Sequence, residues 1–459
     1  APSPEVRWTD SYKNFSAVCY GMGVTLRQNG VPIGLIAIAK GGTLIEEWMP
    51  RGVLREVDTG QGHPHSHLFN GTLHSLRGYG LKGVAWYQGE SNAAAEPVGS
   101  PVVRATRYLT LLPALIRSWR SEWAANGGSG DFYFGIIELS AAGCGISNNA
   151  VYAELRLAQR KVASLVNRAF FVPTFDLGKM DPSSPCGTNS INADIHPPFK
   201  RAVGERAGNL ILGSIMGVSG KPTLSPHLRS AAVSGSKIQM SFNSNGPITI
   251  HPAFTGNALQ VCCDAAGAFV PVSDQGWVVS STGTLLVDMP SGIVRLTTIR
   301  YAFANVVHGP ATTLPANLVN RDSYAHAPLR DASGLPVTLF ATDLRWFDRG
   351  VYIDADTVLA PLSSIRTQAG NLVGWACISH FPIPASFQIV TNSGRALSGV
   401  LQANLTSVGE SSAVCDSQGG TPTHGFSIPI SSLSAFAAGE SGYYVRVVPL
   451  ARKDLLQQN

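Results

Sequence analysis

The chain has 459 residues, of which 44 % are hydrophobic and 14 % charged, so it can fill one or more folded cores and is not intrinsically disordered. Its 48 glycines and 29 prolines favour short strands and turns and exclude a helical bundle. The net charge of +5 comes from scattered residues and does not indicate a nucleic-acid partner. No apolar run reaches the ~18 residues that a membrane-spanning helix needs.

Helical and apolar segments alternate through the first 218 residues, which predicts an α/β domain with a parallel sheet. The predicted helices are 16–28, 108–123, 151–166 and 200–215. The predicted strands are 32–39, 81–87, 132–139 and 169–176. Strands buried on both faces read as nearly continuous apolar runs, and Pro-Ile-Gly-Leu-Ile-Ala-Ile-Ala at 32–39 is the plainest example.

Turns rich in glycine and polar residues follow these predicted strands. Gly41-Gly42-Thr43 follows the first strand, Gln88-Gly89-Glu90-Ser91-Asn92 follows the second, and another loop begins after Asp176. In open α/β sheets the site lies at the carboxyl ends of the strands. Backbone N–H groups and an asparagine side chain there can stabilise an oxyanion, although each turn alone is equally compatible with a structural role. Glu90 is either a catalytic acid or a structural carboxylate.

The segment Asp194-Ile-His196-Pro197 comes directly before the last helix of this domain. A histidine with an acid beside it suits a general base that a carboxylate orients. The alternative is a surface Asp–His pair in a proline-rich loop.

After residue 218 short strands alternate with turns, which predicts two all-β units. The first covers 219–345, and its predicted strands are 237–242, 248–250, 270–272, 277–279 and 293–298. The second covers 346–459 and contains Cys377 and Cys415, for which we expect a disulfide bond.

Cysteines and glycosylation sequons indicate the compartment. Seven scattered cysteines and the sequons at Asn14, Asn70 and Asn404 favour a secreted, cell-surface or lysosome-like glycoprotein. An odd cysteine count leaves one thiol that is either free and buried or bonded to another chain. The chain begins with Ala1 rather than methionine, which is typical of a processed product.

Taken together, the segments resemble the sialate O-acetylesterase family, a branch of the SGNH-type hydrolases. The most specific string is Lys82-Gly-Val-Ala-Trp-Tyr-Gln-Gly-Glu-Ser-Asn92, and matching pieces run in order from about residue 15 to 217 and again over 299–305. The resemblance implies an SGNH-hydrolase-like, parallel three-layer α/β domain at 1–218, followed by two sandwich-like all-β domains at 219–345 and 346–459.

The resemblance also implies a carbohydrate O-acetylesterase with a Ser-His-Asp triad and no metal or cofactor, acting on acetylated sialic acid or related sugars. His196 would be the general base. Asp194 would orient it, and Asp181 is a rival for that role. The oxyanion hole would come from Gly42, Gly89 and Asn92, with Gln88 beside it.

One family block does not occur in this sequence. The nucleophile of such esterases sits in a Gly-Gln-Ser-Asn-type block near the first strand, and neither Ser16 nor Ser91 matches it. We therefore expect an N-terminal small subunit or fragment, cut from the same precursor, that carries the serine and a central strand. The alternative is a catalytically inactive glycan-binding or structural glycoprotein on an esterase scaffold. The sequence is also compatible with a homo-oligomer.

Overall fold

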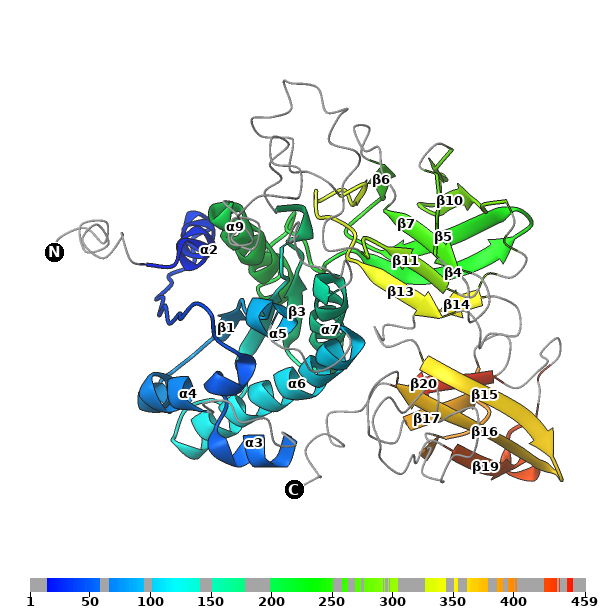
Figure 1. Cartoon of the computed structure of the whole chain (residues 1–459), viewed down its shortest axis with the longest axis horizontal. Helices are drawn as coiled ribbons and strands as arrows, with labels where there is room; N and C mark the ends of the chain where they lie inside the picture. Colours follow the sequence, from blue (N-terminus) through cyan, green and yellow to red (C-terminus); the bar gives the residue numbers. More distant parts are fainter. Residues whose placement is uncertain are drawn as a thin grey trace.

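The protein is described by a computed structural model, shown in Figure 1. The described residues are 15–57, 66–94, 101–140, 151–177, 199–250, 258–262, 269–273, 276–291, 293, 296, 298–303, 327–343, 351–353, 361–378, 386–390, 395–399, 401–402, 425–435, 437 and 444–448. Among these residues, no helix combines the length and the apolar character needed to cross a membrane.

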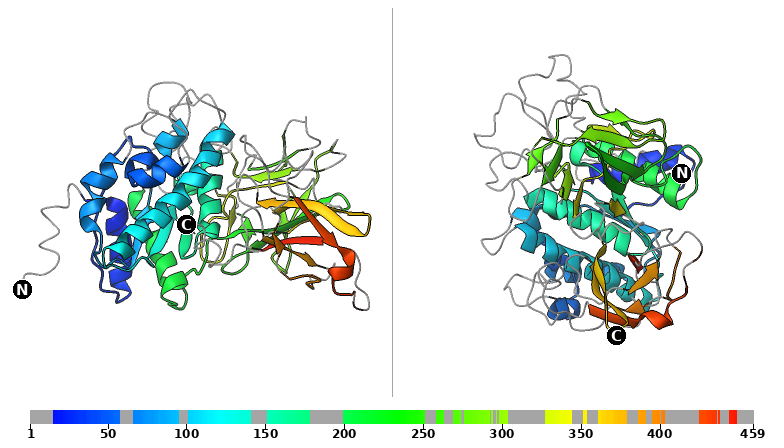
Figure 2. Two further views of the ribbon diagram at one scale, coloured as in Figure 1. Left: turned by 90° about the horizontal axis from the view of Figure 1, so that it is seen from below. Right: turned by 90° about the vertical axis from the view of Figure 1, so that its right-hand side faces the viewer.

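The first part of the chain forms a parallel sheet between two layers of helices. The sheet has the order β1 (Gly83–Trp86), β2 (Tyr133–Ile137) and β3 (Ala169–Val172). The helices α2 (Ala17–Gln28) and α9 (Lys200–Leu210) pack together on one side. The helices α6 (Pro101–Ala125) and α7 (Val151–Leu165) pack on the other side (Figures 1 and 2). This arrangement confirms the predicted three-layer α/β fold.

Shorter elements fill the connections of this region. They are η2 (Ile45–Trp48), α3 (Arg51–Val57), α4 (His67–Gly71), η3 (Leu73–Leu76), α5 (Glu90–Ala94), η4 (Phe175–Leu177) and the π-helical turn η5 (Ile211–Ile215).

Alternate residues of the strands serve two separate cores. Phe134 and Ile136 of β2 belong to the core under α6 and α7, whereas Ile137 belongs to the core under α2 and α9. Phe171 and Val172 of β3 divide in the same way. Both faces of each strand are therefore covered, which explains why 132–139 reads as an almost unbroken apolar run.

The glycines of α2 have a packing role that offsets their low helix propensity. A Cβ atom at Gly21 would lie 2.7 Å from the carbonyl oxygen of Arg201, and one at Gly204 of α9 would lie closer still to that of Val18. Larger residues would force α2 and α9 apart. The α2 helix begins where Ser16 Oγ accepts a hydrogen bond from Cys19 N at 3.3 Å.

The prediction of a buried strand at 32–39 is wrong. This segment has no regular secondary structure, and it pairs with no strand in the described part of the chain. Ile33 and Ile36 are 37 % and 46 % exposed, while Ile38 packs against the core under α6 and α7. A β-strand requires a hydrogen-bonded neighbour, and no described strand lies on the outer edge of β1 to provide one.

The next part of the chain is all β, as predicted. Two antiparallel sheets have the orders β14-β4-β5-β10-β9 and β13-β11-β7-β8, and β12 pairs with β6. The strands are β4 (His227–Ser234), β5 (Lys237–Asn243), β6 (Thr249–Ile250), β7 (Leu259–Cys262), β8 (Val270–Pro271), β9 (Val278–Val279), β10 (Leu285–Asp288), β11 (Thr298–Tyr301), β12 (Leu329–Arg330), β13 (Phe340–Asp343) and β14 (Val351–Ile353).

Two details differ from the sequence-based expectation. The strand predicted at 293–298 begins only at Thr298, where pairing with both β7 and β13 starts. The strand β14 lies in the range predicted for the third unit, yet it pairs with β4 of the second.

The last part contains two three-stranded antiparallel sheets, β15-β16-β19 and β18-β17-β20. The strands are β15 (Pro361–Gln368), β16 (Asn371–Ile378), β17 (Ser386–Val390), β18 (Leu401–Gln402), β19 (Gly425–Pro429) and β20 (Tyr444–Val448), and a 3₁₀ turn, η8, covers Ile430–Ser432. Phe387 and Phe426 pack at 4.4 Å between ring centroids in the small core. Leu165 of α7 packs against this core. The predicted partner of Cys377, Cys415, lies outside the described residues.

Candidate active site

The polar turns predicted from the sequence gather at the carboxyl edge of the sheet. The strand β1 ends at Trp86, and Gln88–Asn92 follows; β3 ends at Val172, and Thr174–Asp176 follows. The turn at Gly41-Gly42 joins this edge because Thr43, directly after it, is hydrogen-bonded to Gln88 in the turn after β1.

Gln88 connects the two glycine turns. Its Nε2 donates to Thr43 O at 3.0 Å and to Asn92 Oδ1 at 2.7 Å. Its Oε1 accepts from the Tyr108 hydroxyl at 3.0 Å. Both amide hydrogens are thus committed within the protein, and the side chain is buried. Gln88 therefore fixes the two turns relative to each other.

Asn92 is held by a chain of polar contacts that the sequence analysis did not find. Its Oδ1 accepts from Ile45 N at 3.0 Å, and its Nδ2 donates to Glu46 Oε2 at 3.0 Å. The other oxygen of the buried Glu46 carboxylate pairs with Arg107 Nη2 at 2.9 Å. The Glu46-Glu47 pair so soon after Gly41-Gly42 was the available signal. Since one Nδ2 hydrogen binds Glu46, a second hydrogen of Asn92 stays available for a ligand.

Two glycine amides complete this edge. Gly42 and Gly89 have φ values of +72° and +145°, a region that side chains disfavour. In the part of the chain that the structure describes, neither backbone N–H donates a hydrogen bond. A Cβ atom at Gly89 would lie 2.5 Å from Leu155 Cδ2, so the position has no room for a larger residue. Unpaired N–H groups are what an oxyanion hole requires.

Gln159 of α7 forms hydrogen bonds to the residues that follow β1 and β2. Its Nε2 donates to Gln88 O at 2.9 Å, and its Oε1 accepts from Leu139 N at 3.1 Å. The side chain is fully buried. Sequence analysis did not single out this residue, because its role depends on contacts across 71 residues of chain.

Glu138 is a buried carboxyl group at the end of β2. Its Oε2 accepts from Thr174 N at 2.7 Å and from Phe175 N at 3.0 Å. Burial raises the pKa of Glu138 to about 7, although the positive charge of Arg156 opposes this shift. Glu138 therefore holds the chain that leaves β3.

Asp176 directly follows Phe175, and its pKa is shifted in the opposite direction to that of Glu138. It pairs with Arg206 at 2.6 Å and with Arg330 at 2.8 Å. Burial by itself would raise the pKa of Asp176, but the two guanidinium groups outweigh burial and lower the pKa to about 2.

Only some of the remaining predicted site residues lie within the described residues. Asp194 and His196, with the rival Asp181, lie outside the described residues, as do Asn14 and Asn404. Asn70 is exposed on α4. Glu90 begins α5 and is partly buried, which is compatible with both of its expected roles. Within the described ranges, no three His, Cys, Asp or Glu side chains group to hold a metal ion.

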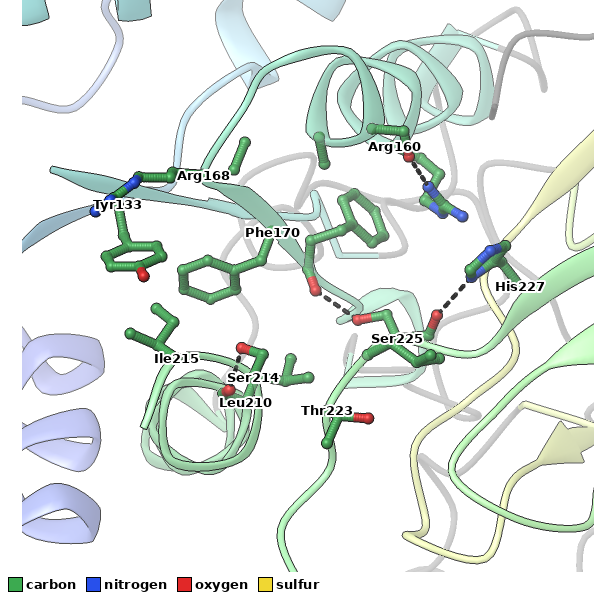
Figure 3. Close-up of a pocket in the computed structure, with 15 residues that line it drawn as sticks. Tyr133, Arg160, Arg168, Phe170, Leu210, Ser214, Ile215, Thr223, Ser225 and His227 are labelled. Atoms are coloured by element: carbon green, nitrogen blue, oxygen red, sulfur yellow. Dashed lines mark hydrogen bonds between the residues drawn. The ribbon is translucent and has the colours of Figure 1, made fainter. Parts of the chain in front are cut away.

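A cavity of about 260 Å³ lies at the opposite edge of the sheet. Tyr133 and Ala169, the first residues of β2 and β3, line it together with Ile215 and His227 (Figure 3). Burial, together with the nearby charge of Arg160, lowers the pKa of His227 to about 3, so this imidazole is neutral at physiological pH. The cavity is distinct from the carboxyl edge, where the glycine turns lie.

Residues 11–182 match the family described as "Carbohydrate esterase, sialic acid-specific acetylesterase". This region is therefore similar to that family over somewhat more than a third of the chain. The human sialate O-acetylesterase is 33 % identical over 211 residues, which cover 42 % of this chain and 38 % of the human protein. The mouse sialate O-acetylesterase is 26 % identical over 339 residues, or 64 % of this chain and 59 % of the mouse protein. The matched part thus spans about two-fifths of the human relative.

A solved structure supports the fold of this chain. A carbohydrate acetylesterase from Xanthomonas citri superposes with a TM-score of 0.55 at 24 % identity, covering 72 % of this chain and 66 % of the other. The coverage of 72 % extends beyond the α/β region into the β region. The predicted family and fold class are confirmed.

Proposed function

We propose that the protein is a carbohydrate O-acetylesterase that removes acetyl esters from sialic acid or related sugars. The observation that carries this proposal is the pair of unpaired amides, Gly42 and Gly89, on turns that Gln88 and Asn92 hold together. The family of residues 11–182 and the names of the mammalian relatives supply the substrate class.

In this mechanism a serine hydroxyl attacks the acetyl carbonyl while His196 takes its proton, and Asp194 orients the imidazole. The amides of Gly42 and Gly89 and the second hydrogen of Asn92 Nδ2 stabilise the oxyanion. The protonated His196 then returns the proton to the sugar oxygen, which leaves as an alcohol. Water hydrolyses the acetyl-enzyme by the same steps and releases acetate.

The nucleophilic serine, in our proposal, belongs to a segment outside residues 1–459, supplied as the small subunit of a processed two-chain protein. Support comes from the outer edge of β1, which no described strand covers, and from the segment 32–39, whose Ile33 and Ile36 are exposed. A strand that paired with both would satisfy the backbone groups of both. A serine at its carboxyl end would then lie beside the turns that hold Gly42 and Gly89.

We also propose that this enzyme is a secreted, cell-surface or lysosomal glycoprotein. The exposed position of Asn70 suits glycosylation, and Asn14 and Asn404 are further predicted acceptors. A Cys377–Cys415 disulfide and domain limits at 218 and 345 belong to the same proposal, although β14 at 351–353 extends the sheet of the second unit. In this proposal the last unit, residues 346–459, is an accessory domain of the esterase.

Acetate release from O-acetylated sialic acid tests the proposed activity, with the complete protein including any chain outside residues 1–459. His196→Ala should lower kcat by at least about 10³-fold. His74→Ala is the matched control, since His74 is exposed on η3 and should leave kcat unchanged. Equal rates for both variants would contradict the assignment of His196. No acetate release by the wild-type protein would favour the glycan-binding alternative.

A further inference from the structure

Lys200 brings a positive charge to the carboxyl edge of the sheet. It is the first residue of α9, and its Nζ lies 4.8 Å from the centre of the Tyr87 ring. Tyr87 comes directly after Trp86, the last residue of β1, and directly before Gln88. An ammonium group over an aromatic ring is attracted by the negative face of the ring. This contact therefore holds the ammonium beside the turn that contains Gly89.

Glu90, the residue after Gly89, lies close enough to act on both groups of this contact. Burial and the charge of Glu90 raise the pKa of the Tyr87 hydroxyl. Burial lowers the pKa of Lys200, and the negative charge of Glu90 opposes that shift. The ammonium of Lys200 is thus near the residues on both sides of the Gln88-Gly89 turn.

The Lys200 ammonium has no carboxylate against it. Among the residues that the structure describes, it forms no hydrogen bond and no ion pair. Lys200 is only partly exposed, so water does not solvate its charge fully. A partly buried charge is costly unless an opposite charge pairs with it. This ammonium is therefore suited to an anion that comes from outside the chain.

Three other cations described at this edge are either paired or exposed. Arg107 pairs with Glu46 at 2.9 Å, and Arg206 pairs with Asp176 at 2.6 Å. Lys40, just before the first glycine turn, is exposed, so water solvates its charge. The half-buried ammonium over the tyrosine ring differs from all three.

We propose that Lys200 binds the carboxylate of an acidic sugar, so that the esterase prefers acetylated sialic acid to neutral acetylated sugars. This inference rests on the proposed function and narrows its substrate to sugars that carry a carboxylate. The carboxylate would lie against the Lys200 ammonium while the acetyl group lies at the turns of Gly42 and Gly89. Lys200 acts through binding and takes no part in proton transfer.

The test measures acetate release by the complete protein from O-acetylated sialic acid and from its methyl ester, which lacks the negative charge. The wild type should have the higher kcat/KM on the free acid. Lys200→Met should lower kcat/KM on the acid at least about tenfold, mainly through KM, because a charge-assisted contact is lost. On the methyl ester the change should stay within about threefold. Lys200→Arg should keep most of the preference, since it keeps the charge.

Arg201→Met is the matched control, because it removes a neighbouring positive charge from the same helix. The Arg201 side chain is 72 % exposed and pairs with Glu205 at 2.7 Å. This variant should leave the ratio of kcat/KM between the two substrates within about twofold of the wild type. An equal loss on both substrates in Lys200→Met would show a structural role and overturn the inference. If Lys200→Met does not fold, Lys200→Gln gives the same comparison.

Binding of unmodified sialic acid, followed by calorimetric titration of the complete protein, gives a readout without turnover. Lys200→Met should raise the Kd at least about tenfold, and Arg201→Met should leave it unchanged. A wild-type protein that neither binds sialic acid nor prefers the free acid would overturn the inference.

The two readouts separate this inference from the proposed function. Weaker binding of sialic acid by Lys200→Met, in a protein that releases no acetate, would retain the carboxylate site and reject the esterase. Acetate release with the substrate ratio and the Kd unchanged in Lys200→Met would retain the esterase and reject the carboxylate site.

Discussion

Two apolar segments of this chain look alike in sequence and differ in structure. Residues 132–139 contain β2, in which Ile136 is fully buried, whereas residues 32–39 leave Ile36 46 % exposed. The strand β2 has β1 on one side and β3 on the other. The segment 32–39 has no strand partner in the part of the chain that the structure describes.

An apolar run becomes a strand only when its backbone finds neighbours. Both segments are largely apolar, so the hydrogen-bond partners of the backbone decide the outcome. An open sheet edge is the kind of surface that another strand binds. Of four predictions, the first and the last test this contrast, and the two between them test the carboxyl edge of the sheet.

The largest effect should come from Ile136→Asp. An unpaired carboxylate in the core under α6 and α7 should lower the free energy of unfolding by more than about 4 kcal/mol. Urea denaturation followed by circular dichroism measures it. A loss below about 1 kcal/mol would mean that β2 is not a central strand.

Asp176→Asn should come next, because it leaves two arginines beside a neutral side chain. We expect a loss of about 3–5 kcal/mol at pH 7. The pKa of Asp176 is about 2, below its ordinary 3.8, so its stabilisation is present above pH 3.8 and disappears as the pH falls towards 2. The difference between wild type and variant should therefore shrink by about 2 kcal/mol in acid denaturation. An unchanged difference at pH 2 would contradict the ion-pair account.

Gly89→Ala should cost about 2–4 kcal/mol, from its positive φ and the overlap with Leu155. Gly42→Ala is the matched control: its φ is also positive, but no atom lies within 4 Å of a Cβ there, so about 1 kcal/mol is expected. Thermal unfolding of both variants compares them. Equal losses would show that backbone strain alone matters at Gly89.

The smallest effect on stability belongs to Ile36→Asp. Because Ile36 is exposed, the chain 1–459 should lose no more than about 0.5 kcal/mol. In the complete protein the same variant should lower acetate release at least about tenfold, since a charge would face the proposed inserted strand. Full activity of the Ile36→Asp protein would contradict a strand at this edge.

Part of the fold and of the candidate site could be predicted from the sequence, and part could not. The α/β pattern and the glycine turns at Gly42 and Gly89 are local signals, so the sequence indicated them correctly. Glu46 and Gln159 act through contacts across 46 and 71 residues, which no local pattern reveals. The same holds for Arg330, which meets Asp176 across 154 residues. The segment 32–39 failed as a predicted strand because its state depends on a neighbour.

Our proposal places the nucleophilic serine outside residues 1–459 and the oxyanion hole on the turns of Gly42 and Gly89 within them. A fluorophosphonate probe that labels activated serines, followed by peptide mapping of the complete protein, tests this division most directly. We expect one labelled serine on a peptide absent from residues 1–459, and no label after His196→Ala. A labelled serine within 1–459, or no label at all on the wild-type protein, would contradict the division.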